Sequence, residues 1–352
     1  MDYKKKIEDL ILAVIHQGGS DLHLGAGRMP AVRIEGELIF LVKEPPLTQE
    51  DMKGILGELL PKEKVAVFLE EKEADFSYDF RGEARLRGNA FFQTGLINIA
   101  LRLVPKVQSL SDLHLPPILA EITRKKQGFF LVVGPVGQGK STTLSAMINL
   151  INNEQTKNIL TIEDPIEHVY VPNKSIISQR EVGIDTKDFH VALKSVFRED
   201  VNVIMIGEMR NPETIATAVT AAETGHLVLS TLHTNNASQT IDRIIDSFPG
   251  EQQDQIRSQL STSLLGIFSQ RLIPRIAGGL VPAHELLLNN NAVANLIREK
   301  RTHEIDVVIE TSSEAGMVDF NHSLIELVRA GEISIESAHQ FSFNPKGLER
   351  MM

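Results

Sequence analysis

The chain of 352 residues contains no cysteine and no tryptophan, and it has only 3 tyrosines. Without cysteine it can form neither disulfides nor cysteine-ligated zinc sites, which fits a reducing compartment. With so few large aromatic side chains, stacking platforms for nucleic-acid bases are not expected. The sequence also lacks any apolar run near the roughly 20 residues that a membrane-spanning helix needs, so we expect no integral membrane segment.

Positive charge is also in deficit. The 36 Lys and Arg residues stand against 46 Asp and Glu, and the formal net charge is −10. Nucleic-acid-binding proteins usually carry a basic surface, so we expect no direct nucleic-acid partner. Hydrophobic residues at 42% and charged residues at 23% are typical of a globular protein with a buried core. The length favours about two domains of roughly 100–200 residues each.

The N-terminal region mixes helical and strand patterns. Apolar spacing predicts a helix over residues 3–16 and another over 48–60. Alternating apolar and polar residues predict several strands. These strands cover residues 21–24, 31–41, 75–80, 84–92 and 97–104. Consecutive strands with short turns favour an antiparallel sheet, so we expect a mixed domain of helices and strands over residues 1–104.

A proline-containing stretch follows this region. Residues 105–117 contain three prolines and two serines without a clear period. This composition predicts a linker, although a surface loop within one domain is the alternative. After it, apolar strands at 129–134, 158–163, 202–207 and 226–233 alternate with helical runs such as 142–152 and 212–223. Such alternation favours a parallel sheet covered on both faces.

Beyond Gln252 the pattern becomes mostly helical. One apolar stripe at helical spacing consists of Ile256, Leu260, Leu264 and Ile267. Two shorter helical runs follow at residues 292–298 and 324–328. We therefore expect a second domain over residues 118–352, with an α/β core and a helical C-terminal part.

The strongest motif follows the strand at 129–134. Residues 134–141 match G-x-x-x-x-G-K-[ST], and a helix with an apolar face comes next. The glycines let backbone N–H groups surround a phosphate, and the helix N-terminus adds positive potential. We expect Lys140 to reach the β- and γ-phosphates of ATP and the Ser141 hydroxyl to bind Mg²⁺. The expected nucleotide-binding residues are Gly134, Pro135, Val136, Gly137, Gln138, Gly139, Lys140, Ser141, Thr142 and Thr143.

Hydrolysis also needs a carboxylate that orients the attacking water. Two acidic groups follow apolar strands: residues 163–167 contain Glu163, Asp164 and Glu167, and Glu208 follows the strand at 202–207. Ligands of wound sheets lie at the carboxyl ends of the strands, so we expect both groups to face the phosphate loop. A helix-capping or solvated role is the alternative for Glu208.

Two histidines bracket the strand at 226–233. His226 and His233 are seven residues apart, so in a regular strand they would point to opposite faces. His233 lies at the carboxyl end, near the phosphate loop by topology, and we expect it to be functional. His226 lies at the other end, where functional and structural roles are equally favoured. No second ligand has the helical spacing that zinc sites use, so a metal site is not indicated.

Together these segments resemble the secretion-type ATPases, and within them the type IV pilus retraction ATPases, over nearly the whole chain. The resembling segments are 20–24, the Walker A loop at 134–143, the Asp box at 161–167, the Walker B region at 207–215 and the His box with its sequel at 220–249. The resemblance implies a RecA-like P-loop core with a parallel sheet and a smaller N-terminal PAS-like α+β domain. It further implies a homo-hexameric ring with ATP between the two domains and adjacent subunits.

The resemblance also implies roles for matching residues. Glu208 would be the general base, and the acidic residues of the Asp box would order water or metal, with Asp164 as a metal ligand. The two histidines would serve the γ-phosphate side. Arginines of the family's N-terminal domain reach the nucleotide, and simple solvation on a strand face is the alternative for their counterparts here. The implied catalytic positions are Glu208, Glu163, Glu167, His233, His226, Arg85, Arg87 and Arg102.

The implied function is a motor that hydrolyses ATP with Mg²⁺ to retract type IV pili and drive twitching motility. Such a motor would be cytoplasmic, peripherally associated with the cytoplasmic face of the inner membrane. Its implied partners are an inner-membrane platform protein and a second pilus ATPase. Two alternatives stay open: a paralogous ATPase for DNA uptake or type II secretion, and a weakly hydrolysing nucleotide-dependent scaffold.

The chain departs from the family pattern at a few positions. Gln138 stands where Ser is usual, and Thr94 stands where an additional Arg often appears. Residues 292–299 resemble a C-terminal motif tied to retraction, but Ala294 replaces its first Arg. The last two departures favour the scaffold alternative and leave retraction less secure than nucleotide hydrolysis.

Overall fold

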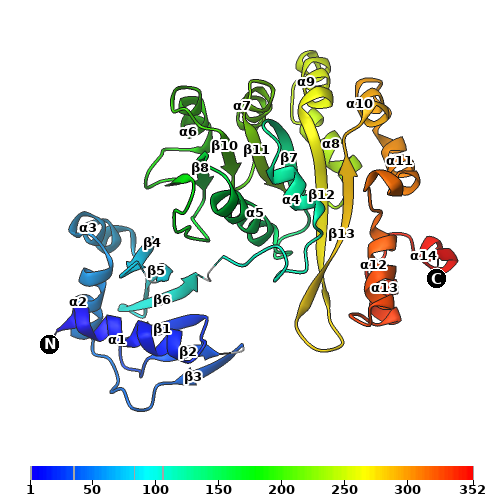
Figure 1. The fold of residues 1–352 in the computed structure, drawn as a ribbon. Coiled ribbons are helices and arrows are strands. Elements are labelled where there is room, and N and C mark those ends of the chain that lie inside the picture. Colours follow the sequence, from blue (N-terminus) through cyan, green and yellow to red (C-terminus); the bar gives the residue numbers. More distant parts are fainter. Residues whose placement is uncertain (1, 35, 83, 105–106, 352) are drawn as a thin grey trace. The chain divides into compact units, whose positions relative to one another are not determined.

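The computed structural model describes residues 2–34, 36–82, 84–104 and 107–351. The chain divides into two compact units (Figure 1). The first unit comprises Met1–Lys106 and Glu167–Val169, and the second comprises Val107–Ile166 and Tyr170–Met352.

The expected linker at 105–117 belongs largely to the second unit. Residues 105 and 106 lie outside the described residues, and residues 107–117 group with the second unit. Leu115 is buried there in a cluster with Leu119 and Phe130. This apolar contact holds the end of the stretch on the second unit.

The first unit is built on an antiparallel sheet. Its helices are α1 (Tyr3–His16), α2 (Gln49–Leu59) and α3 (Lys62–Glu71). Its strands are β1 (Asp21–Gly25), β2 (Ala31–Ile34), β3 (Glu37–Phe40), β4 (Glu73–Phe80), β5 (Ala84–Gln93) and β6 (Leu96–Val104). In the described part of the chain these six strands are ordered β3-β2-β1-β6-β5-β4, and neighbouring strands are antiparallel. The expected antiparallel sheet is confirmed.

Apolar residues of one sheet face form the core of this unit with the helices. Leu22 and Leu24 of β1 alternate with polar neighbours and pack in one cluster with Ile11 of α1 and Ile55 of α2. The alternation of apolar and polar residues along a strand therefore determines which of its faces packs against the helices. Thr48 begins α2 with a capping box, since its side chain and that of Asp51 each accept the other's backbone N–H.

One expectation for this unit was wrong, and one helix was missed. The single strand expected over residues 31–41 is a hairpin of β2 and β3, with Gly36 in its turn at φ +88°. Glycine adopts such an angle without steric cost, so the chain reverses there. The helix α3 was not expected, because its charged sequence has little apolar periodicity and buries Phe68 as its main anchor.

The second unit contains a mostly parallel sheet. Its strands are β7 (Gly128–Val133), β8 (Asn158–Glu163), β9 (Ile176–Glu181), β10 (Val203–Ile206), β11 (Leu227–Leu232), β12 (Leu264–Pro274) and β13 (Leu280–Leu288). Among the described residues the order is β13-β12-β7-β11-β10-β8-β9. Neighbouring strands are parallel except for the antiparallel pair of β12 and β13. The expected parallel core is confirmed, and β13 is an antiparallel addition at its edge.

Helices cover both faces of this sheet (Figure 1). Apolar residues of α4 (Ile118–Thr123) and α5 (Lys140–Glu154) pack on one face in a cluster that includes Val132 and Leu229. The other face packs against the remaining helices of the core in a cluster that includes Leu131 and Val228. These helices are α6 (Phe189–Ser195), α7 (Pro212–Glu223), α8 (Ala237–Asp246), α9 (Gly250–Ser263), α10 (Asn291–Arg298) and α11 (Ile305–Thr311).

The helical stripe expected over residues 256–267 was wrong in its second half. Helix α9 ends at Ser263, and Leu264 begins strand β12. Leu264 and Ile267 are buried in the sheet, because β12 pairs with β7 on one side and β13 on the other. An apolar run buried on both faces does not distinguish a strand from a helix by its period. The region beyond Gln252 is mostly helical as expected, and the hairpin of β12 and β13 interrupts it.

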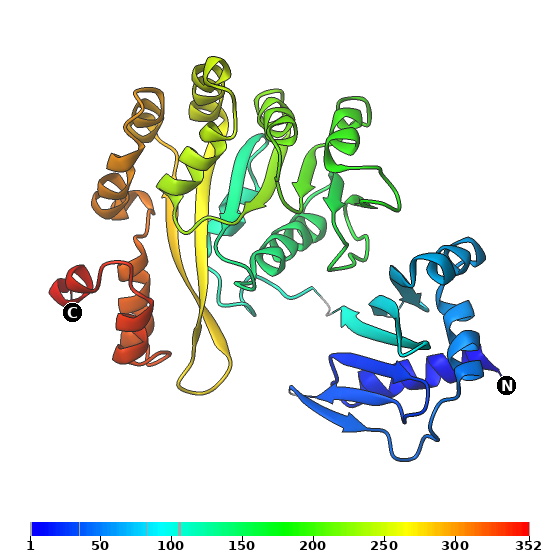
Figure 2. The same ribbon diagram turned by 180° about the vertical axis from the view of Figure 1, so that it is seen from behind.

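The C-terminal part packs on the β12–β13 hairpin (Figure 2). A separate cluster joins Ile273 and Val281 of the hairpin to Leu324 of α12 and Ala338 of α13. The helices here are α12 (Phe320–Arg329), α13 (Ile335–Phe341) and α14 (Pro345–Met351). Every helix in the described ranges is too short or too polar to span a bilayer.

Candidate active site

The phosphate loop connects the buried strand β7 to helix α5. Gly134, Gly137 and Gly139 have φ values of +146°, +77° and +75°. These angles suit glycine, which has no Cβ to clash with the backbone. At Gly134 a Cβ would lie 2.4 Å from the backbone oxygen of Gln270, so the loop begins in direct contact with β12. The motif residues therefore fold as a strand, a tight loop and a helix start.

Lys140, the first residue of α5, points back across this loop. Its side chain is buried, and Nζ donates to the carbonyl oxygens of Gly134 at 2.9 Å and Pro135 at 2.8 Å. The same Nζ lies 3.3 Å from Nδ1 of His233. The ammonium group is thus held over the loop and beside the end of β11.

His233 links the phosphate loop to the acidic residue that follows β10. Because an ammonium group can only donate, Nδ1 of His233 accepts from Lys140. The ring proton therefore lies on Nε2, which is 3.3 Å from Oε2 of Glu208 and donates to it. This orientation follows from the partners and fixes the neutral tautomer.

The carboxylate of Glu208 has a second partner in Arg210. Nη2 of Arg210 forms an ion pair with Glu208, and its Nη1 lies 3.8 Å from Oδ2 of Asp164. Strands β7, β11, β10 and β8 are neighbours and run parallel, so the residues after them meet at one edge of the sheet. Side chains from four separate segments thereby form one chain of contacts: Lys140, His233, Glu208, Arg210 and Asp164.

Glu163 ends strand β8 in a buried position. Its Oε1 accepts a hydrogen bond from Thr161 Oγ1 at 2.6 Å and another from Gln179 Nε2 at 3.2 Å. Burial, with a smaller contribution from the Glu163 carboxylate, raises the pKa of Tyr170 above its usual range. Glu163 is therefore a buried carboxylate that accepts hydrogen bonds from Thr161 and Gln179, and it precedes Asp164 of the contact chain in the sequence.

The structure does not bring His226 to this edge. Leu227 begins β11 opposite Gly128, at the start of β7, while Leu232 lies opposite Val133 at its end. His226 instead has Nδ1 3.0 Å from the Ala221 carbonyl oxygen and stacks edge-on against Phe197, with ring centroids 5.7 Å apart. Within one chain His226 thus lies at the opposite end of β11 from His233, and its expected role beside the γ-phosphate stays a prediction.

The remaining expected positions belong to the first unit. Glu167 lies in the segment that groups with that unit, and Arg85, Arg87 and Arg102 lie on β5 and β6. Arg87 is paired with Arg102 across the two strands. Their expected contact with nucleotide stays a prediction.

One of these arginines has a partner within its own unit. Nε of Arg102 donates to Oδ1 of Asp21 at 2.8 Å, while the side chain of Arg102 is 71% exposed. Burial raises the pKa of Asp21, but hydrogen bonds from Ser20 and Arg102 outweigh it and hold that pKa below its usual range. Asp21 therefore orients a guanidinium that remains accessible to a ligand.

Two residues of the second unit were missed in the sequence. Arg210 lies within the Walker B segment, two residues after Glu208, and that position was the available signal. Gln270 lies on β12, in a region expected to be helical, and its side chain accepts from the Thr143 hydroxyl at 2.7 Å. Nothing in the sequence pattern marked Gln270, because its contact joins residues 127 positions apart.

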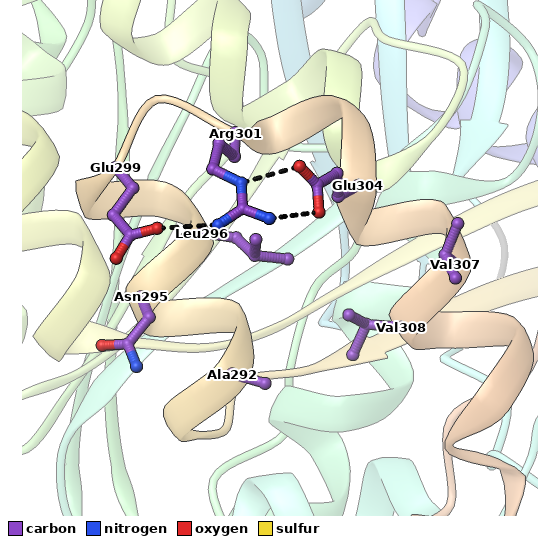
Figure 3. A pocket seen from close by; sticks show the side chains of 8 residues that line it. All are labelled: Ala292, Asn295, Leu296, Glu299, Arg301, Glu304, Val307 and Val308. Carbon is purple, nitrogen blue, oxygen red and sulfur yellow. Dashed lines mark hydrogen bonds and ion pairs between the residues drawn. The ribbon is translucent and has the colours of Figure 1, made fainter.

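A cavity of about 400 Å³ lies between α10 and α11 (Figure 3). Arg301 crosses its rim, donating to both carboxylate oxygens of Glu304 at 2.7 Å and to Glu299 at 3.0 Å. Its lining residues are Ala292, Asn295, Leu296, Glu299, Arg301, Glu304, Val307 and Val308. One face of α10, from the motif at 292–299, thus lines a hollow that shares no residue with the phosphate-loop contacts. Ala294 is buried and does not line it.

Comparison with known proteins places these features in a family. The family model described as type II/IV secretion system protein matches residues 98–300. PilT, the type IV pilus retraction ATPase of Pseudomonas aeruginosa, is 42% identical over 95% of this chain and 97% of its own length. A twitching motility protein of Neisseria gonorrhoeae is 44% identical over 91% of this chain and 86% of its own. A crystal structure of the pilus retraction motor PilT with bound ADP is 46% identical, has a TM-score of 0.91, and covers 98% of this chain and 99% of that one.

Proposed function

This chain belongs to the type II/IV secretion system protein family, and from that membership we propose that it is a motor ATPase that retracts type IV pili. The contact chain from Lys140 through His233 to Glu208 carries the enzymatic part of the proposal. It links the residue that would bind phosphate to the residue that would activate water. The similarity to a pilus retraction ATPase over 95% of the chain supports the mechanical part.

The residues at the sheet edge suit hydrolysis of a nucleoside triphosphate. The loop N–H groups and Lys140 would bind the phosphates and stabilise the negative charge that develops as the γ-phosphate is cleaved. Glu208 would accept a proton from the attacking water. For that step its carboxylate must part from Arg210, whose side chain is 65% exposed and can move toward solvent. His233 would hold Lys140 of the phosphate loop and the base Glu208 in fixed positions relative to each other.

Magnesium fits the donors at this edge. The described residues hold no cluster of three or more His, Cys, Asp or Glu side chains that could bind a metal alone. Mg²⁺ usually takes one or two protein oxygens and completes its shell with phosphate oxygens and water. The Ser141 hydroxyl and the Asp164 carboxylate are hard oxygen donors of this kind. Bound there, Mg²⁺ would neutralise phosphate charge.

The wider assembly follows the family. We propose a homo-hexamer in the cytoplasm, held at the inner face of the membrane by a platform protein, with a second pilus ATPase as a further partner. In such a ring Arg85, Arg87 and Arg102 would reach nucleotide bound to the second unit. Turnover at successive subunits would move the platform and return pilin to the membrane.

The enzymatic proposal is tested by phosphate release and nucleotide binding on the purified protein. Lys140→Ala should abolish turnover and weaken binding, whereas Glu208→Gln should abolish turnover and keep ATP binding. Glu213→Gln, an exposed acid on the first turn of α7, is the matched control and should behave like the unchanged protein. Near-normal hydrolysis by Glu208→Gln would remove Glu208 as the base.

The mechanical proposal is tested in cells. A strain that lacks the gene should carry excess surface pili and lose twitching, and Glu208→Gln should fail to restore either phenotype. Normal piliation together with defective secretion or DNA uptake would favour the paralogous alternative. A purified hexamer that binds ATP without releasing phosphate would favour the scaffold.

A further inference from the structure

Strand β12 extends past the end of its neighbour β7. The last paired residues are Ser269 and Val133, whereas β12 continues to Pro274. Backbone groups of β12 that lie beyond this pair on the β7 side therefore face the phosphate loop. Backbone N–H groups that leave a sheet ladder must find another partner.

Gln138, in the phosphate loop, provides that partner. Its side-chain oxygen accepts a hydrogen bond from the Leu272 N–H at 2.7 Å. Its backbone oxygen accepts one from Nε2 of Gln270 at 2.5 Å. A single loop residue is thus attached to β12 through both its side chain and its backbone.

Gln270 extends this attachment to the helix that follows the loop. Its side chain is buried, and Oε1 accepts a hydrogen bond from Thr143 Oγ1 at 2.7 Å. The amide orientation is fixed, because a backbone carbonyl can only accept from Nε2. Gln270 also lies against two loop glycines. A Cβ added to Gly134 would lie 2.4 Å from the backbone oxygen of Gln270, and a Cβ added to Gly139 would lie 3.0 Å from its Nε2.

We propose that Gln138 and Gln270 are positioning residues that form a clasp, holding the phosphate loop in its nucleotide-binding shape against β12. The clasp consists of the contacts of Gln138 with Leu272 and Gln270 and the contact of Gln270 with Thr143. Neither glutamine belongs to the chain of contacts from Lys140 to Asp164. The proposal rests on the nucleotide site of the proposed function and adds the element that sets its affinity.

The clasp acts before the nucleotide binds. The loop N–H groups bind phosphate only when several of them point inward together. Without the clasp, a smaller share of unbound molecules holds that arrangement, and apparent affinity falls in proportion to the share. Bound phosphates then hold the loop themselves, so the chemical step proceeds from the same arrangement. Loss of the clasp should therefore raise KM and leave kcat nearly unchanged.

The test measures ATP and ADP dissociation constants with Mg²⁺, together with steady-state kcat and KM, on the full-length protein. Gln138→Met keeps side-chain length but removes the acceptor for Leu272, and it should weaken both nucleotides by about 3- to 10-fold with kcat within about twofold. Gln270→Met should act in the same direction. The double variant should fall short of the product of the two effects, because both substitutions loosen one loop.

Gln155→Met is the matched control. Gln155 follows α5 at its far end, and its side chain donates to the Thr123 carbonyl oxygen at 2.9 Å, so this variant loses a similar hydrogen bond away from the loop. It should bind both nucleotides like the unchanged protein. Gln270 is buried, so its variant can fail to fold. The result for Gln138→Met, at a partly exposed residue, therefore decides the test, and a thermal unfolding curve checks that this variant is folded.

Two results would overturn the clasp. One is unchanged nucleotide affinity in Gln138→Met, and the other is an equal loss of affinity in Gln155→Met. A loss of affinity in the double variant equal to the product of the two single losses would also contradict the proposal that both glutamines act as one unit. These outcomes differ from failure of the proposed function, in which the unchanged protein itself would bind neither nucleotide.

Discussion

The two ends of strand β11 carry the same residue type in different surroundings. At the carboxyl end, His233 lies between Lys140 and Glu208. At the amino end, His226 contacts the Ala221 carbonyl and packs against Phe197. The residue type alone does not distinguish them. Their chemistry differs because parallel strands collect the loops with polar side chains at one edge of the sheet.

The same contrast holds for strand β8. Glu163 ends it beside the contact chain, whereas Asn158 begins it and bonds to Asn202, Glu199 and Asp200. One end lies beside the chain of contacts, and the other end bonds to the loop before β10. Matched substitutions at the two edges should therefore separate turnover from stability.

The largest effect is expected for alanine at two glycines, one at each edge. Gly134→Ala places a Cβ 2.4 Å from the Gln270 backbone oxygen, which cannot yield, and the loop must shift. We expect turnover to fall by roughly 10²–10³-fold, as misplacement by about 1 Å allows. Gly225→Ala, at φ +110° with no atom within 4 Å, should cost about 1–3 kcal/mol of stability and spare turnover. Phosphate release and urea unfolding of both variants check this, and equal losses of turnover would break the comparison.

A smaller effect is expected for the two histidines. His233→Ala removes the link between Lys140 and Glu208 and should lower kcat by roughly 10–10²-fold, the scale of a lost active-site hydrogen bond. His226→Ala should reduce the free energy of unfolding by about 1 kcal/mol and change kcat by less than about twofold. Steady-state kinetics on both proteins decides the matter. A larger loss of kcat in His226→Ala would mean that a neighbouring subunit uses this histidine.

A modest effect is expected at the two ends of β8. Thr161→Val removes the hydroxyl that donates a hydrogen bond to Glu163 at 2.6 Å. We expect kcat to fall by roughly threefold, because the carboxylate of Glu163 loses this hydrogen bond and is held less firmly. Asn158→Ala should lower stability by about 1–2 kcal/mol through its lost loop contacts, with kcat retained. The two readouts are phosphate release and denaturant unfolding. A loss of kcat in Asn158→Ala and unchanged kcat in Thr161→Val would contradict this interpretation of the two ends of β8.

The smallest effect on turnover, with a distinct pH signature, is expected at Glu285. Its carboxylate accepts the Ala237 N–H at the start of α8, and burial raises its pKa to about 7, assisted by Asp306 and Asp319. In the unfolded chain its pKa is near 4.5, so the folded form binds the proton more tightly. Its contribution to stability is full below about pH 4.5 and is lost as pH rises through about 7.

Glu285→Gln should therefore gain stability relative to the unchanged protein between pH 5 and 8, by on the order of 2–3 kcal/mol. Urea unfolding at several pH values measures this difference. Glu251→Gln, at an exposed position in the first turn of α9, is the control and should show a flat difference. A flat difference in Glu285→Gln as well would place Glu285 outside the titration of the folded protein.

Much of the core was predictable from local sequence. The strands β7, β8, β10 and β11 were expected because each is a short apolar run bounded by polar loops. The phosphate loop was expected because its glycines and lysine have a fixed spacing. The hairpin of β12 and β13 was not, since apolar residues buried on both faces look alike in a helix and in a strand.

The candidate site was predictable in part. Lys140, Glu208, His233 and Asp164 follow predicted strands, and the structure places them in one chain of contacts. Their catalytic roles stay predictions. Arg210 and Gln270 were missed, because a salt bridge or a side-chain hydrogen bond leaves no period in the sequence.

The sequence by itself determined the strands β7, β8, β10 and β11, the phosphate loop and the family, because these depend on residues close together in the chain. Tertiary structure alone decided which carboxylate pairs with Arg210 and what attaches the loop to β12. Such contacts join residues up to 134 positions apart. They exist only because parallel strands bring their carboxyl ends to one edge of the sheet.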